Sequence, residues 1–174
     1  MKHAVLSLLF SVIGIFSVLN TSNASTPLMQ LDSLLSERES QFSSFIQHTV
    51  EPFWQQHVQT GQFSNQQKLA IHYAFALPDT PQNAIVISPG RGEGYLKYKE
   101  LTYDLYKLGY AVFIIDHQGQ GLSTRRLDNR YKGYVEQFDD YVQDLHQFIK
   151  QIVKTQYDGN LFMLSHSMGG AIGL

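Results

Sequence analysis

Apolar positions along the chain change their spacing near residue 78. Between residues 29 and 49 they recur every three or four positions, which predicts an amphipathic helix. Residues 68–77 alternate between apolar and polar, as in a half-buried strand. Three later runs are wholly apolar and suit strands of a parallel sheet that is covered on both faces, namely residues 84–87, 111–115 and 161–164.

Helical patterns separate these apolar strands. Residues 98–108 place three leucines on one face, and Gly109 follows where a helix commonly ends. Residues 135–153 form a longer amphipathic pattern, and Ser167 opens another helix directly after the last strand. This alternation predicts an α/β fold with a mostly parallel sheet, helices on both faces and right-handed crossovers.

Three polar or glycine-rich loops follow the apolar strands, at residues 88–94, 116–124 and 165–170. Each loop leaves the carboxyl end of its strand. Because ligands of open parallel sheets bind beyond these strand ends, we expect the three loops to converge on one functional rim.

The first 24 residues have the features of an export signal. Lys2 precedes an apolar run at residues 4–19, and small residues stand at positions 22 and 24. This predicts a secretory signal peptide cleaved after Ala24, and hence a periplasmic or secreted protein. An uncleaved inner-membrane anchor is the alternative. We therefore divide the chain into the signal (1–24), a helical entry segment (25–67) and an incomplete α/β domain (68–174).

Composition excludes several classes of function. The 174 residues include 13 basic and 15 acidic ones, so no basic surplus favours a nucleic-acid partner. The absence of cysteine excludes disulfides, thiolate catalysis and cysteine-based zinc sites. The seven histidines show no metal-binding spacing, and no phosphate or dinucleotide loop is present. We therefore expect neither a metal nor a cofactor, and the oligomeric state is left open.

The strongest chemical signal is the sequence S-H-S-M-G-G around Ser167. It follows an apolar strand, opens a helix and matches the nucleophile elbow G-x-S-x-G, with Ser165 in place of the first glycine. Such an elbow holds its serine in a strained turn that exposes the hydroxyl. The neighbouring positions must be small because strand and helix pack together there. A serine at an ordinary helix N-terminus is the alternative.

An acyl-transfer site also needs hydrogen-bond donors for the oxyanion. The backbone N–H of Met168, at the start of the helix, is one candidate. The loop S-P-G-R-G-E after the first apolar strand is where this fold supplies the second donor, and we assign that role to the N–H of Arg91. A plain turn is the alternative interpretation of this loop.

Other polar and charged residues lie near these motifs. Asp116 is expected to hold its loop by accepting backbone hydrogen bonds, although a catalytic role is the alternative. His117 and His166 each adjoin a motif, but neither is expected to be the general base. Arg125 and Arg126 either meet an anionic headgroup or lie on a solvated loop.

The combination of motifs resembles the monoacylglycerol lipase and lysophospholipase group of α/β hydrolases. The likeness covers roughly residues 40–174 and rests on S-P-G-R-G-E-G-Y-L-K-Y, D-H-Q-G-Q-G-L-S, F-D-D-Y-V-Q-D-L and S-H-S-M-G-G-A. It implies Ser167 as the nucleophile and the amides of Arg91 and Met168 as oxyanion donors. It also implies hydrolysis of the carboxylic ester of a monoacyl lipid, with association at a membrane surface as a further expectation.

The triad of this fold runs in the order serine, acid, histidine. Only seven residues follow Ser167, and none of them is acidic or a histidine. We therefore expect the sequence to be an N-terminal fragment, truncated after the elbow and inactive by itself. The alternative is a non-catalytic remnant of a hydrolase that binds lipid or a partner.

Overall fold

The structure is a computed structural model that describes residues 37–129 and 131–174. The predicted signal peptide, residues 1–24, lies outside the described residues. Within the described ranges, no helix has both the length and the apolar character that crossing a bilayer requires. The chain divides into two compact units, Met1–Phe42 and Ser43–Leu174, and the sheet lies in the second.

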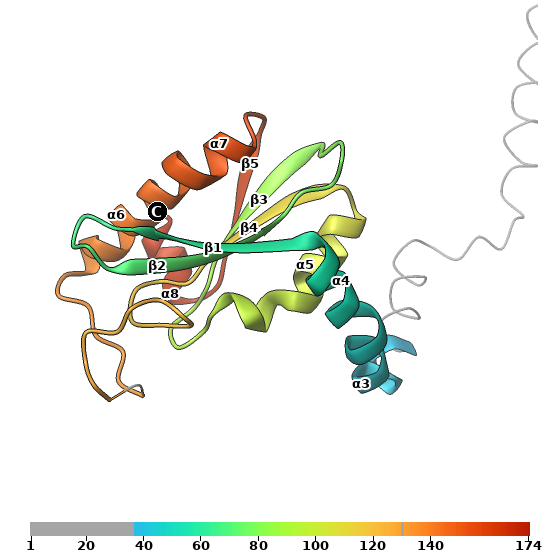
Figure 1. Cartoon of the computed structure of the whole chain (residues 1–174), viewed down its shortest axis with the longest axis horizontal. Coiled ribbons are helices and arrows are strands. Elements are labelled where there is room, and N and C mark those ends of the chain that lie inside the picture. The colour runs from blue at the N-terminus through green and yellow to red at the C-terminus, as the bar shows by residue number, and fades with distance from the viewer. Residues whose placement is uncertain (1–36, 130) are drawn as a thin grey trace, which may run out of the picture. The chain divides into compact units, whose positions relative to one another are not determined.

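The strands are β1 (Val58–Ser64), β2 (Ala70–Ala76), β3 (Asn83–Ser88), β4 (Tyr110–Ile115) and β5 (Leu161–Ser165). They form one sheet in the order β1-β2-β4-β3-β5 (Figure 1). Strand β2 is antiparallel to its neighbours β1 and β4, whereas β3 is parallel to β4 and β5. Only β2 runs against the others, so the α/β fold with a mostly parallel sheet is confirmed.

The helices are α3 (Phe42–Phe45), α4 (Glu51–His57), α5 (Lys99–Lys107), α6 (Phe138–Phe148), α7 (Lys154–Gln156) and α8 (Met168–Ile172). Two π-helical turns, Ile46–Val50 and Ile149–Val153, continue into α4 and α7, and a 3₁₀ turn at Tyr95–Tyr98 precedes α5. Helix α6 begins where Gln137 and Asp140 form a reciprocal capping box. The helices predicted at residues 98–108 and 135–153 are thus present, with shifted ends.

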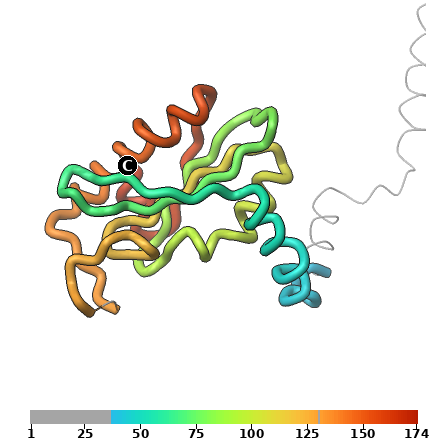
Figure 2. The backbone as a smooth tube through the Cα atoms, in the orientation of Figure 1, coloured from blue at the N-terminus to red at the C-terminus, as the bar shows by residue number. Residues whose placement is uncertain are grey.

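The segment before the sheet differs from the sequence prediction. The helix expected at residues 29–49 lies partly outside the described residues. Within them it continues through the π-helical turn Ile46–Val50 to His57, with Pro52 in the first turn of α4. The entry segment 25–67 is also not helical throughout, because β1 forms within it and pairs with β2. Figure 2 shows the chain passing directly from α4 into this edge strand.

Side chains of the sheet alternate between two apolar layers, which confirms helices on both faces. Val86, Phe113 and Ile115 pack with Leu145 and Phe148 of α6, in a layer that also contains Ile172 of α8. Their strand neighbours Ile87, Val112 and Ile114 pack on the opposite face with Trp54 of α4 and Leu101 of α5. The central strands β3 and β4 are therefore buried between helices, as their continuous apolar sequences predict.

Strand β5 is the exception to this burial. It lies at the edge of the described sheet. Phe162 is 56% exposed, and Met163 and Leu164 are also exposed, so the expectation that this strand is covered on both faces is wrong for the described residues. Pairing with β3 nevertheless fixes its register, with Ser165 opposite Ser88, and carries the chain to the rim.

Candidate active site

Ser167 occupies a sharp turn between β5 and α8. Its backbone angles are φ 51° and ψ −118°, a left-handed conformation that a serine adopts only under strain. The residue is solvent-exposed and is the N-cap of α8. The structure therefore has the backbone geometry predicted for a nucleophile elbow.

The small residues around Ser167 have a steric reason. A Cβ atom on Gly169 would lie 2.0 Å from the Ser88 carbonyl oxygen, so only glycine lets the turn approach β3 this closely. The His166 N–H donates to the same carbonyl oxygen at 3.1 Å. In the next position, a Cβ on Gly170 would meet Ser165 Cβ at an ordinary 3.9 Å, so the steric demand for glycine is specific to position 169.

The loop after β3 reaches the elbow, as predicted. The Gly90 N–H donates to Glu93 Oε2 at 2.8 Å, and the Glu93 N–H donates to Gly90 O at 3.3 Å, which closes a tight turn. Among the loop and turn hydrogen bonds of the described residues, none has the N–H of Arg91 or of Met168 as its donor. Arg91 and Met168 line the same cavity, of about 780 Å³. The two residues proposed as oxyanion donors therefore line one cavity, and neither N–H donates in the loop and turn hydrogen bonds of the described residues.

Glu93 joins the elbow to this loop, a role that the sequence analysis did not assign. Its carboxylate accepts hydrogen bonds from the Gly90 N–H, from Tyr98 OH at 2.6 Å and from Lys97. His166 Nδ1 lies 3.1 Å from Glu93 Oε2. Burial alone would raise the pKa of Glu93, but these donors together lower it to about 2. Glu93 is therefore a carboxylate at neutral pH.

Neither histidine near the motifs is arranged as a general base for Ser167. His166 turns its ring toward Glu93, and His117 is fully buried with Nε2 3.0 Å from Ser88 Oγ. Ser88 Oγ uses its own hydrogen to donate to Gly169 O, so it can only accept in its contact with His117. His117 Nε2 is therefore the protonated ring nitrogen and donates the hydrogen bond to Ser88. Burial lowers the pKa of His117 to about 4, so the ring is neutral. His117 therefore has a structural role, since it is linked through Ser88 to Gly169 of the elbow.

Asp116 holds two loops together. Its carboxylate accepts from the N–H of Tyr95 at 2.5 Å and from the N–H of Leu122 at 2.7 Å. The side chain is 1% exposed, and burial raises its pKa. This arrangement matches the loop-holding role that the sequence analysis favoured over a catalytic one.

A buried polar cluster lies beneath the loop after β4, and the sequence analysis did not find it. Asp144 of α6 is 3% exposed and accepts from Asn65 Nδ2 at 2.9 Å and Gln118 Nε2 at 3.1 Å. Burial raises the pKa of Asp144 to about 6. The sequence contains one feature that could have revealed this cluster. Asp144 is an acidic residue on the apolar face of the helix, between Tyr141 and Phe148.

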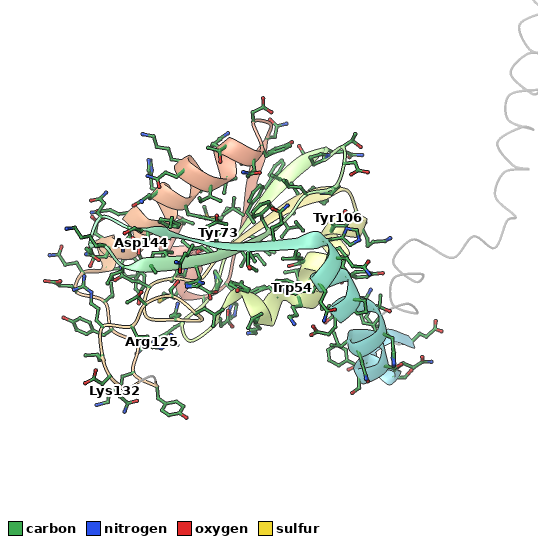
Figure 3. All side chains as sticks on the ribbon, in the orientation of Figure 1. Trp54, Tyr73, Tyr106, Arg125, Lys132 and Asp144 are labelled. Carbon is green, nitrogen blue, oxygen red and sulfur yellow. The ribbon has the colours of Figure 1, made fainter. Side chains whose placement is uncertain are left out.

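The two arginines of the loop between β4 and α6 differ in their surroundings. Arg126 pairs with Glu136 at 3.0 Å, whereas Arg125 Nη1 donates to Gly121 O at 2.9 Å and lines the cavity beside Met168. Figure 3 shows Arg125 on this loop, with Lys132 farther along it. Within the described ranges, no three acidic or histidine side chains are grouped to hold a metal ion.

Comparison with known families matches residues 79–174 to the family described as Hydrolase_4, serine aminopeptidase S33. Lysophospholipase L2 of Escherichia coli K12 is 40% identical over 135 residues, which are 78% of this chain and 39% of that protein. Monoglyceride lipase of Mus musculus is 38% identical over 95 residues, covering 55% of this chain and 30% of the lipase. The chain thus spans well under half of the relatives it matches.

Solved structures give the same fold. A carboxyl esterase from Bacillus coagulans superposes with a TM-score of 0.58 at 24% identity, covering 67% of this chain and 38% of the esterase. A monoglyceride lipase from Saccharomyces cerevisiae, solved with a substrate analogue, gives a TM-score of 0.52 at 27% identity over 66% of this chain and 36% of the lipase. The described residues therefore correspond to about a third of each neighbour.

Proposed function

Because the chain belongs to the Hydrolase_4 (serine aminopeptidase S33) family of α/β hydrolases, we propose that it carries the nucleophile of a serine esterase for monoacyl lipids. The observation that carries this proposal is the strained, exposed turn at Ser167, whose neighbour Met168 lines one cavity together with Arg91. The similarity to a lysophospholipase and to monoglyceride lipases supports the choice of substrate, a lysophospholipid or a monoacylglycerol.

The chemistry begins with attack of Ser167 Oγ on the ester carbonyl carbon. The Oγ–C bond forms, and the carbonyl oxygen becomes an oxyanion that accepts from the N–H groups of Arg91 and Met168. The Oγ proton passes to a base and then to the leaving glycerol oxygen as the ester C–O bond breaks. Water adds to the acyl-enzyme, Oγ departs with a proton, and the fatty acid is released.

The base in this scheme is a histidine oriented by an acid. In the described part of the chain, no histidine hydrogen-bonds to Ser167, and His166 and His117 have the other contacts given above. The proposal therefore requires a histidine and an orienting acid in addition to the described residues, and it concerns an enzyme that supplies them. A non-catalytic, lipid-binding remnant is the second candidate, favoured by the observation that no histidine in the described part of the chain hydrogen-bonds to Ser167.

Hydrolysis assays test the proposal. We expect the complete gene product to release fatty acid from lysophosphatidylcholine or monoacylglycerol, and Ser167→Ala to reduce kcat/KM by several orders of magnitude. Ser64→Ala, an exposed serine on the opposite edge strand, is the matched control and should retain activity. Full activity in Ser167→Ala would refute the esterase mechanism, and no activity in the wild type would favour the remnant.

A further inference from the structure

The loop that follows β4 contacts both halves of the candidate active site. On one side, Gln120 Oε1 accepts the N–H of Gly92, the residue next to the proposed oxyanion donor Arg91. On the other side, His117 Nε2 lies 3.0 Å from Ser88 Oγ, which in turn donates to the elbow. The position of this loop therefore influences both the loop that carries Arg91 and the turn that carries the serine.

Asp144 of α6 anchors the same loop from below. Its Oδ2 accepts from Gln118 Nε2 at 3.1 Å, and its Oδ1 accepts from Asn65 Nδ2 at 2.9 Å. Asn65 lies between β1 and β2 and is itself fixed, because its Oδ1 accepts from the N–H groups of Gln67 at 3.0 Å and Leu69 at 2.8 Å. Asp144 thus connects the loop after β4 to a helix and to a well-ordered turn.

The carboxylate of Asp144 is expensive at this position. It is 3% exposed and lies on the apolar face of α6, between Tyr141 and Phe148. Burial raises its pKa to about 6, although the hydrogen bonds from Asn65 and Gln118 oppose that rise. An apolar side chain would pack here without the cost of burying a charge. It could not orient Gln118, however, because only an acceptor fixes the direction of that amide.

We propose that Asp144 is a positioning residue for the candidate active site. Its hydrogen bond to Gln118 fixes the loop after β4, and through Gln120 that loop holds Gly92 and the adjoining N–H of Arg91 in place. Asp144 does not line the cavity beside the elbow, so it acts through these residues and touches no reacting atom. The inference rests on the proposed function only for the role of Arg91 as an oxyanion donor.

Amide hydrogen exchange of the full chain, followed by NMR, tests this positioning role. The N–H of Gly92 reports the contact between the two loops. We expect Asp144→Ala to accelerate its exchange by about tenfold or more. A loss of global stability alone would accelerate amides that exchange through unfolding, such as that of Phe113 in β4, and would leave Gly92 unchanged. The matched control is Asp139→Ala, which removes an exposed acid of the same helix and should not affect Gly92.

Asp144→Asn is the conservative variant and should restore slow exchange of the Gly92 N–H. Its side-chain oxygen can still accept from Asn65. In the described part of the chain, Gln118 Oε1 has no hydrogen-bond partner, so the Gln118 amide can turn over and accept from the new amide group without losing another bond. Exchange as fast as in Asp144→Ala would contradict hydrogen bonding as the link between Asp144 and the loop.

Gln118→Met tests the same link from the other side and leaves Asp144 in place, which covers the case that Asp144→Ala does not fold. We expect it to accelerate exchange at Gly92 as well. Unchanged Gly92 exchange in folded Asp144→Ala or in folded Gln118→Met would overturn the proposal. Faster exchange in these variants, combined with no hydrolysis by an enzyme that supplies the base, would refute the proposed function and leave the positioning of the loop intact.

Discussion

Gly169 lies directly against the Ser88 carbonyl, so that a Cβ atom at position 169 would be 2.0 Å from that oxygen. The same carbonyl accepts the His166 N–H, and the Ser88 hydroxyl donates to Gly169 O. Hydrogen bonds to His166 and Gly169, the residues before and after the Ser167–Met168 pair, thus hold the start of α8 against the end of β3. This contact sets the position of the serine relative to the loop that carries Arg91.

Adding one methyl group at Gly169 tests this contact. Gly169→Ala must push the turn away from Ser88, and we expect it to lower the free energy of unfolding by about 1–3 kcal/mol and to misplace Ser167. Gly170→Ala is the matched control, because its Cβ would have ordinary contacts and should change stability by less than about 0.5 kcal/mol. Urea unfolding measures both, and equal stabilities for the two variants would contradict the packing argument.

Glu93 should make the free energy of unfolding depend on pH in the acidic range. Its pKa in the folded chain is about 2, against an ordinary value of 4.5, so the unfolded chain binds the proton more readily. The stabilisation is present above pH 4.5 and is lost as the pH falls toward 2. We expect the free energy of unfolding of wild type to fall over this range more steeply than that of Glu93→Gln.

Tyr98→Phe removes one hydrogen-bond donor to Glu93. It should reduce the slope of the free energy of unfolding against pH, but by less than Glu93→Gln does. Identical pH dependence in wild type and Glu93→Gln would show that the carboxylate is not stabilised by its contacts. The measurement is urea unfolding at a series of pH values between 2 and 6, at constant ionic strength.

The exposed edge of β5 should limit the solubility of the isolated 174-residue chain. Its outer side offers unpaired backbone groups and apolar side chains to a second molecule. We expect Phe162→Lys to reduce aggregation in light scattering. The control is Leu108→Lys, since Leu108 is 68% exposed but lies outside the strands. Equal benefit from both variants would attribute the effect to charge alone.

We also propose that the N-terminal residues direct export, as their charge and apolar run indicate. Expression of the complete gene product in a bacterial host should yield a periplasmic or secreted protein whose N-terminus is Ser25. Intact-mass measurement of the processed protein checks this. An unprocessed N-terminus in the membrane fraction would favour the anchor, and an unprocessed cytoplasmic protein would refute export.

Strands and site residues that depend on local sequence could be predicted. The apolar runs of β3 and β4 mark buried strands, and the order of strand, Ser167 and helix marks the elbow. Strand β1 was missed because its sequence is mostly polar and only Phe63 in it is buried, as suits an edge strand. The local sequence does not favour a strand there, and pairing with β2 stabilises the extended conformation.

Contacts between distant loops could not be predicted from the sequence. Glu93 meets His166, 73 residues later, and Gln120 meets Gly92, 28 residues earlier. Neither pair has a local sequence pattern, because both depend on which strand ends the sheet topology brings together. The rim predicted from the strand ends was correct, whereas the hydrogen bonds across it required the folded chain.

Fluorophosphonate labelling of the complete gene product, followed by peptide mass spectrometry, tests the role of Ser167 most directly. The account predicts one stoichiometric adduct on Ser167, no adduct in Ser167→Ala and unchanged labelling in Ser64→Ala. An adduct on another residue, or labelling that persists in Ser167→Ala, would contradict it.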